Sequence, residues 1–587
     1  MFLLIIAILT TLFYLWSPFK EKEVSDVYSE KEGRLLLPQH NVAIISLDLN
    51  EAGILFTQSK DFLLLRPLQQ DLIELKGVSK VESILNVSRV ISKGDDIIVT
   101  KAIPSDNSEV TNQYLEDLSS EIKDFPELSP YINEKHDTLL FYIYFANKTF
   151  PQDIYTGLNE LQVKWQNSLP FEFTGQGPVI AETELLLTKD ISLFFPLLVL
   201  MVILVFSLFR NIKVVLASLF LILLSIISAY GFVRFIGIQD SPLLLLIPVF
   251  SLGLLSDYLI HFFYHHLYTP RLEGKSSLRK LLMFPLSLTA LSTLMGFLSL
   301  SLINGSGHLQ VGLIIAVAVI VTWFGVFFWL DFGKRLQGTK HLLSGFQASQ
   351  GVFFAKLARF RYVFFIAIAL VMIWGGFQLK NLSIEPYPIE QLPETSTIIK
   401  SDQIINNEFY GTLPFFLEID TGEKNGILKK DTMLKLESIH NKMEEEQIGF
   451  AYSMLTVLKR MNYYFMGDEN SLLTSNEFDD FYDSLIQQYL LYYSSSVDPL
   501  EYESLLDNSY RVFSIKGLIS YHNYKDLDNF LILLENIQTD FPENWSLNLH
   551  GMAKQLEIEH SNLQKNWIFS FLGGSLLIFI TVLIFYR

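Results

Sequence analysis

Four residues with one spacing carry the chemistry that stands out in this chain. Gly253, Asp257, His261 and His265 recur at every fourth position, so on a helix they form a single stripe. Asp257 lies close to the centre of the apolar stretch Leu243–Leu267. A carboxylic acid at the middle of a membrane is costly unless it faces protein or water, so Asp257 must have a structural or a functional reason to be there.

Two interpretations of Asp257 are open. In the structural one, burial keeps the carboxyl group neutral and a neighbouring hydroxyl satisfies it. In the functional one, a buried acid whose ionised form is disfavoured loads and releases a proton during transport. We favour the second, with His261 beside it because histidine titrates near neutral pH. Hydroxyl groups within reach on the same or the next helix are those of Ser256, Thr289, Ser292 and Thr293. For these four the first expectation is packing, because such hydroxyls often bond back to their own helix.

Other site chemistries are less well supported. Asp257, His261 and His265 have the right types for a metal site, but zinc needs three or four converging ligands and a proton path accounts for the same stripe. The sequence has no Gly-x-Ser-x-Gly, no His-Glu-x-x-His and no Walker loop. We therefore expect a secondary transporter rather than an enzyme, with no metal and no cofactor, driven by an ion gradient.

The composition favours a membrane protein. Of the 587 residues half are apolar and 48 are Phe, which is more apolar surface than a soluble protein of ordinary composition carries. A net charge of −18 argues against a nucleic-acid partner. The absence of cysteine excludes thiol catalysis, thiolate metal sites and disulfides.

Eight stretches approach the roughly 20 apolar residues that a membrane helix needs. They are Met1–Trp16, Ile191–Phe209, Val214–Ile236, Leu243–Leu267, Leu281–Ile303, Leu309–Leu330, Tyr362–Leu379 and Trp567–Tyr586. The first lacks the features of a cleaved signal and is expected to stay as an anchor. Basic residues gather in the loops between helices two and three, four and five, and six and seven, which predicts that these loops and both termini are cytoplasmic. The segments 20–189 and 380–564 then lie on the outer side.

Both outer segments show alternating strand and helix patterns. In the first we expect strands at 41–47, 78–84, 139–145 and 171–175 and helices at 63–75 and 154–166. In the second we expect strands at 413–419, 510–517 and 545–550 and helices at 428–445 and 527–538. Such alternation predicts a small α/β sandwich in each segment. The aromatic helix at 481–493 could line a lipid path, although a core helix is the commoner explanation.

An internal repeat links the two halves at the membrane boundary. Phe173-Thr-Gly-Gln-Gly leads through a polar helix to a span that ends at Arg210, and Leu549-His-Gly-Met-Ala leads in the same way to Arg587. The two glycine-to-arginine distances are nearly equal, which indicates duplicated architecture.

This organisation resembles the RND superfamily, closest to its MMPL-type branch, in which one helix, an exported domain and five helices are followed by the same set again. Gly253-Leu-Leu-Ser-Asp-Tyr-Leu-Ile-His261 resembles the Gly-x-x-x-Asp-Tyr signature of MMPL-type exporters on the fourth helix. Pro285-Leu-Ser-Leu-Thr-Ala-Leu-Ser-Thr-Leu-Met-Gly-Phe-Leu-Ser-Leu300 resembles the fifth helix of that family. The match reaches the eighth helix and then stops, without the last four.

The resemblance implies an α-helical polytopic membrane protein with two exported α/β domains of ferredoxin-like, porter type. The expected domains are 1–19 (helix 1), 20–189 (first exported domain), 190–332 (helices 2–6), 333–361 (cytoplasmic linker), 362–379 (helix 7), 380–564 (second exported domain) and 565–587 (helix 8). It also implies that Asp257 carries the proton, with Tyr258 and His261 in the relay and Gly253 in support. A tenth helix normally completes that relay, so a second chain is expected to supply the remaining helices.

The expected function is proton-driven export of lipids or other hydrophobic molecules across the cytoplasmic (inner) membrane, with the exported domains in the periplasm. The alternative is a sensor, a scaffold or a truncated relic that keeps the fold without transport. A Sec-type translocation accessory would carry Asp-x-Asn followed by Glu-Arg on the fourth helix, and Asp257-Tyr-Leu-Ile-His does not match it.

Overall fold

The computed structural model describes residues 42–585, apart from 94–95, 123–124, 147–148, 236–246, 269–274, 303–305, 333–361, most of 362–386, 446–449, 468–481 and 498. The chain divides into two compact units. One, the α/β unit, is formed by Glu23–Thr183 and Glu385–Glu559. The other, the helical unit, is formed by Met1–Lys22, Glu184–Ile384 and His560–Arg587. The predicted outer segments therefore belong to one compact unit, within which each forms its own sheet.

The first module of the α/β unit has the chain order βαββαβ. Its elements are β1 (Val42–Asp48), α3 (Leu65–Ile73), β2 (Val78–Glu82), β5 (Thr138–Phe145), α5 (Pro151–Trp165) and β6 (Glu172–Gly175). The strands form a sheet in the order β2-β5-β1-β6, and every neighbouring pair is antiparallel.

The second module repeats this order. Its elements are β7 (Leu413–Asp420), α15 (Lys430–Glu445), β8 (Phe450–Ser453), β9 (Val512–Ile519), α20 (Tyr524–Thr539) and β10 (Ser546–His550). The sheet order is β10-β7-β9-β8, again with antiparallel neighbours only. Numbered within each module, both sheets run 4-1-3-2, which confirms the predicted similarity of the two segments.

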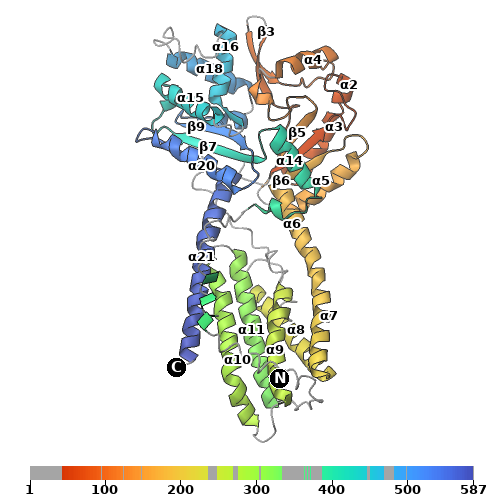
Figure 1. Ribbon diagram of the computed structural model, residues 1–587. Coiled ribbons are helices and arrows are strands. Elements are labelled where there is room, and N and C mark those ends of the chain that lie inside the picture. The colour runs from red at the N-terminus through yellow and green to blue at the C-terminus, as the bar shows by residue number, and fades with distance from the viewer. Residues whose placement is uncertain are drawn as a thin grey trace. The chain divides into compact units, whose positions relative to one another are not determined.

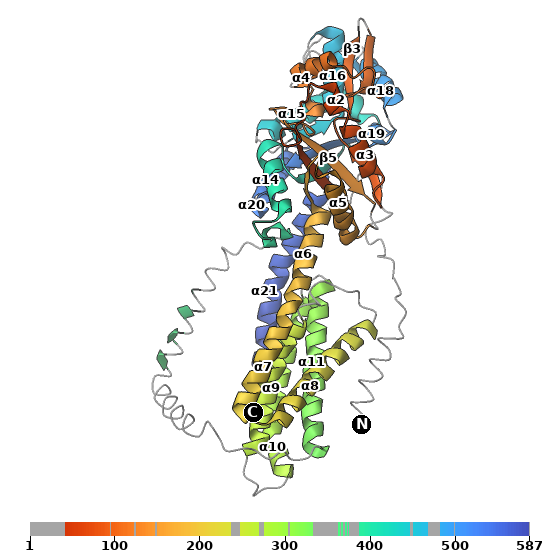
Figure 2. The ribbon, with the colours of Figure 1, turned by 90° about the vertical axis from the view of Figure 1, so that its right-hand side faces the viewer.

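Each module carries an insertion between its second and third strands. The first insertion holds the hairpin of β3 (Ser88–Lys93) and β4 (Asp96–Lys101) and the helix α4 (Asn112–Glu121). The second insertion holds α16 (Met454–Met466), α18 (Tyr482–Ser496) and α19 (Pro499–Glu503). The hairpin lies against α16 and α18, as both ribbon views show (Figures 1 and 2). The sequence patterns did not predict the hairpin, α4, β8 or α16.

A further helix ties the two modules together. Helix α14 (Thr397–Glu408) precedes the second module in sequence but packs on β1 and β6 of the first (Figure 1). Ser401 Oγ lies 2.9 Å from Ser46 Oγ, and the hydroxyl of Thr174 donates to Asp402 at 3.5 Å. The opposite face of the same sheet is covered by helices of its own module, where the rings of Tyr155 and Phe173 make an edge contact.

This two-sided cover explains why the central strands are apolar along their whole length. β1 and β5 bury both faces, with Ile44, Ile45, Leu139 and Leu140 almost fully enclosed. A strand covered on one side only would alternate apolar and polar residues instead. The apolar runs of β1 and β5 therefore mark strands that are covered on both faces.

The helical unit contains six of the eight predicted spans as helices. They are α7 (Phe194–Phe209), α8 (Ile212–Phe235), α9 (Ile247–Tyr268), α10 (Lys275–Leu298), α11 (Ser306–Phe332) and α21 (Met552–Phe585). The first predicted span lies outside the described residues, and so does most of the seventh. By length and composition, four described stretches can cross a membrane: Gln176–Phe209, Ile212–Phe232, Val311–Phe328 and Met552–Ile584. These long apolar helices are compatible with membrane insertion.

Helix α21 joins the bundle through small residues. The hydroxyl of Ser570 donates to the carbonyl of Ser299 at 2.8 Å, at the end of α10. A Cβ on Gly574 would lie 2.5 Å from Ser299 Oγ, and one on Gly296 would lie 3.6 Å from Ile578 Cδ1. Close approach through Gly and Ser is a common way for membrane helices to associate, and α21 lies beside α10 in Figure 1.

Candidate functional site

Helix α9 has one packed face and one open face. The packed face places Leu255, Leu259 and Phe262 in the apolar core shared by α7, α8, α10 and α11. The open face carries Asp257 and His261, both exposed within the described bundle. Asp257 and His261 therefore lie on one face of α9, as the i, i+4 spacing predicts, and this face is turned away from the apolar core.

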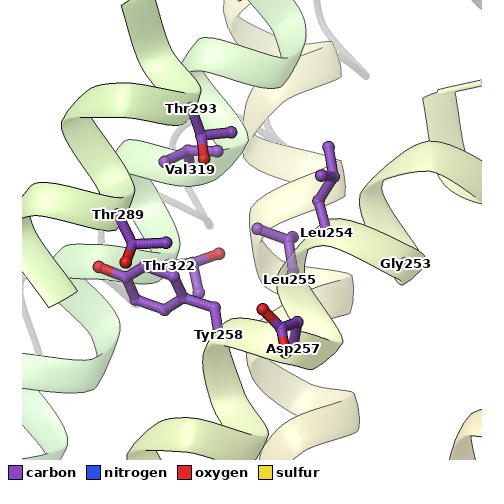
Figure 3. A pocket seen from close by; sticks show the side chains of 9 residues that line it. All are labelled: Gly253, Leu254, Leu255, Asp257, Tyr258, Thr289, Thr293, Val319 and Thr322. Atoms are coloured by element: carbon purple, nitrogen blue, oxygen red, sulfur yellow. The ribbon is translucent and has the colours of Figure 1, made fainter. Parts of the chain in front are cut away.

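Asp257 borders a cavity of about 160 Å³ between α9, α10 and α11. Its wall is formed by Gly253, Leu254, Leu255, Asp257, Tyr258, Thr289, Thr293, Val319 and Thr322 (Figure 3). Such a volume exceeds the roughly 30 Å³ that one water molecule occupies in the liquid. The cavity can thus bring several waters, or a polar group of another helix, to the carboxylate.

The surroundings of Asp257 differ from the buried site that the sequence predicted. Its side chain is exposed, and among the described residues it makes no hydrogen bond or ion pair. The helix turn that buries Leu255 and Leu259 in the core necessarily turns Asp257 outward. The predicted burial of the carboxyl group is therefore not provided by the described helices.

Tyr258 is buried, but it does not point toward Asp257. Its hydroxyl donates to the carbonyl of Leu286 on α10 at 2.5 Å, and its ring lies across the cavity from the carboxylate (Figure 3). This contact joins α9 to α10 directly after Pro285, which lies inside α10. In this arrangement Tyr258 fixes the position of the helix that carries Asp257, rather than sharing a proton with it.

Three of the four candidate hydroxyls bond to their own helices. Ser256 donates to the carbonyl of Gly253 at 2.9 Å, Thr289 to that of Pro285 at 3.0 Å and Ser292 to that of Thr289 at 3.0 Å. The packing role expected for them is thereby confirmed. Thr293 lines the cavity.

Gly253 and His265 are the other two members of the stripe, and the described residues of this stripe form no cluster of metal ligands. Gly253 is exposed, and a Cβ there would meet no atom within 4 Å, so the space beside α9 is open at this position. The side chain of His265 lies outside the described residues. Within the described part of the chain, no three His, Asp or Glu side chains come together as metal ligands would.

The aromatic helix of the second module is mainly a core helix. In α18 the rings of Tyr482, Tyr489 and Tyr493 are buried, whereas Tyr492 and Leu491 are exposed. This agrees with the commoner explanation of its sequence.

A second group of ionisable residues was missed by the sequence analysis. Arg89 on β3, Glu127 on the 3-10 turn Pro126–Leu128 and Arg460 on α16 are all at most 8 % exposed and border one small cavity. They come from both insertions and are far apart in sequence, so no local spacing pattern could have revealed them.

No protein-family model matches the chain, and a search of curated proteins finds no match either.

Proposed function

We propose that this chain is part of a proton-driven exporter of lipids or other hydrophobic molecules, built like the MMPL-type members of the RND superfamily. The observation that carries the proposal is the duplicated module. Two βαββαβ modules with the same 4-1-3-2 sheet, the arrangement called ferredoxin-like, are each followed directly by a long helix with an apolar span, Gln176–Phe209 and Met552–Ile584. This is the order expected for the RND superfamily, in which each exported domain is followed by membrane helices.

The open face of α9 supports proton coupling at Asp257. A carboxylate at the centre of a membrane helix costs roughly 2.5–3.5 kcal/mol on insertion scales. We take this cost as a sign that Asp257 has a function. The neighbouring cavity of about 160 Å³ gives protons and water a place next to the group. His261, on the same face one turn further along, supplies a second side chain that can bind a proton.

The same face supports the proposal of a second chain. Asp257 and Gly253 are exposed on α9, with open space beside Gly253, and an exposed glycine is suited to the close approach of another helix. We propose that a helix of a partner chain covers this part of α9 and faces Asp257, which completes the proton relay. The lipid bilayer and a hydrophobic cargo are the other expected partners.

The orientation follows the distribution of basic residues. Arg210 lies in the short connection between α7 and α8, and Lys213 lies in the first turn of α8. Basic residues at such a connection tend to stay in the cytoplasm. We place both termini in the cytoplasm of a cell with an inner membrane, and the α/β unit on its outer, periplasmic side. A reporter fused after Arg587 should be active only in the cytoplasm.

The test introduces Asp257→Asn into the gene in its natural host. Lipids extracted from the cell surface of the variant and of the wild type are then compared by mass spectrometry. Asn keeps the size of the side chain but cannot carry a proton. We expect normal protein level, and loss of the same lipid species that disappear when a protonophore collapses the gradient.

Tyr258→Phe is the matched control from the adjacent position. It removes the hydrogen bond to Leu286, worth about 0.6 kcal/mol in membrane helices, and leaves the titrating group in place. Its lipid profile should change only slightly. An unchanged lipid profile for Asp257→Asn contradicts proton-driven export and favours a sensor or scaffold instead.

A further inference from the structure

The two insertions meet at a contact that encloses charged groups. Arg89 from the first insertion is 6 % exposed, Arg460 from the second is 8 % exposed, and Glu127 from the first is 8 % exposed. The two guanidinium groups each lie 4.9 Å from the centre of the Phe125 ring. The cavity beside them has a volume of about 10 Å³, room for one water molecule at most. We call this contact the insertion seam.

Among the described residues, the polar contacts of Arg89 do not include Glu127, and its Nε and Nη1 atoms are buried without a hydrogen bond. Arg89 lies 3.7 Å from Glu121 and donates to the hydroxyl of Tyr114 at 3.0 Å. Each arginine also has a cation–π contact with Phe125, which stabilises a desolvated cation. Arginine stays protonated in proteins. Glu127 is therefore the member of this group whose charge can change.

Burial raises the pKa of Glu127 to about 7, although backbone N–H groups and the charges of Arg460 and Arg89 act in the opposite direction. The other ionisable side chains that border or influence this carboxyl group are Glu121, Tyr452, Tyr464, Tyr493 and Glu501. The tyrosine hydroxyls do not ionise near neutral pH, and Glu121, with a side chain 53 % exposed, is hydrated. Glu501 accepts from the Ser88 hydroxyl at 3.3 Å, and burial raises its pKa as well.

We propose that Glu127 is a proton-dependent latch between the two modules: the insertions pack against each other when its carboxyl group is protonated and separate more readily when it is ionised. The inference rests on the seam itself and does not depend on a transport function.

The direction follows from linkage. A carboxyl group with an ordinary pKa in the separated state and a raised pKa in the packed state binds its proton more tightly when packed. Packing is favoured fully below the ordinary pKa of glutamate, and this advantage is lost as the pH rises through about 7. Between pH 5.5 and pH 8.5 the packing equilibrium should change by roughly 30-fold.

The test measures the distance between the insertions in the full-length protein. The chain has no cysteine, so Ser120→Cys on α4 and Ser495→Cys on α18, both exposed positions, can be spin-labelled selectively. We expect a single short distance by double electron–electron resonance at pH 5.5 and a growing longer component as the pH rises, with a midpoint near 7.

Three variants decide whether Glu127 is responsible. Glu127→Gln keeps the size and the hydrogen-bonding capacity of the protonated acid, so its distance distribution should be narrow at every pH. Glu121→Gln removes an exposed carboxylate beside the same arginine and should behave like wild type. His440, whose Nε2 lies 3.0 Å from Ser453 Oγ, is a buried histidine of the second module, and His440→Gln should also keep the pH dependence. A pH-independent wild type, or a Glu127→Gln variant that still opens as the pH rises, would overturn the latch.

Discussion

The side chains of Asn133 and Asp507 make the same pair of hydrogen bonds in the two modules. In each case Oδ1 accepts from the N–H of the third strand's first residue and from the N–H of the residue before it, at 3.0 and 3.1 Å for Asn133 and at 2.7 Å for both bonds of Asp507. In each turn one non-glycine residue has a positive φ, 58° at His136 and 52° at Tyr510. The duplication thus extends to single hydrogen bonds in a turn where the two sequences differ.

Asn133→Ala and Asp507→Ala should each lower the stability of the α/β unit. Each removes an acceptor from two backbone N–H groups at the entry to a central strand, a loss on the order of 1–3 kcal/mol. The measurement is the thermal unfolding midpoint of the full-length protein in detergent. Asp507→Asn keeps the accepting oxygen and should have a smaller effect; if it were as damaging as alanine, the oxygen would not be what holds the turn.

Gly175→Ala should be strongly destabilising, because Gly175 has a φ of +113° and a Cβ there would lie 2.3 Å from the carbonyl oxygen of Val42. Positive φ at a residue with a side chain costs on the order of 1–3 kcal/mol before any clash. Gly53, with a φ of +68° and no atom within 4 Å of a Cβ, gives the control. Gly53→Ala should lower the unfolding midpoint clearly less than Gly175→Ala, and equal effects would mean that the contact with Val42 is unimportant.

Asp402 should make the stability of the α/β unit depend on pH. Burial raises the pKa of its carboxyl group to about 6, against hydrogen bonds with Thr412, Thr174 and Asn406. Because the folded-state pKa is the higher one, its favourable contribution is present below its ordinary value of 3.8 and is lost as the pH rises through about 6.

Between pH 5 and pH 8 this linkage amounts to about 1.4 kcal/mol of unfolding free energy, so Asp402→Asn should reduce the fall in unfolding midpoint over that range. Asp528→Asn, at an exposed position of α20, should leave that fall as it is in wild type. The same pH profile in Asp402→Asn and wild type would exclude Asp402 as its source.

Gly574→Leu should detach α21 from α10. A Cβ on Gly574 already comes within 2.5 Å of Ser299 Oγ, so leucine cannot enter without separating the helices. Ser575→Leu, the next residue and an exposed one, is the control. Limited proteolysis in membranes should cleave the Gly574→Leu protein faster near α21 and the Ser575→Leu protein at the wild-type rate.

The central strands and most helices were predictable because their residues are continuous in sequence and strongly patterned. β1, β5, β7 and β9 are apolar runs, and the buried stripes of α3, α5, α15 and α20 have helical period. Helix α14 was not predicted, because its buried face mixes Ile398 and Ile405 with Ser401 and Asp402 and the apolar stripe is therefore weak. The four-residue β8 is too short for any pattern.

The candidate site was predictable in composition but not in exposure. The spacing of Gly253, Asp257 and His261 places them on one face of α9 whatever surrounds it. Which face the neighbouring helices cover depends on how α7, α8, α10 and α11 pack, and that information is spread over the whole helical unit. The sequence therefore predicted the stripe, whereas the predicted burial of Asp257 is not provided by the described helices.

The position of α14 in the sequence delays the completion of the first module during synthesis. The first module completes its own strands at Gly175, but the helix that covers the Ser46 and Thr174 face of its sheet begins only at Thr397. At ribosomal speeds the wait is on the order of ten seconds or more, during which α7 to α11 emerge. The nascent first sheet must keep an apolar face uncovered throughout that interval, so a chaperone that binds this face, and not the membrane insertion machinery alone, should limit the yield of folded protein.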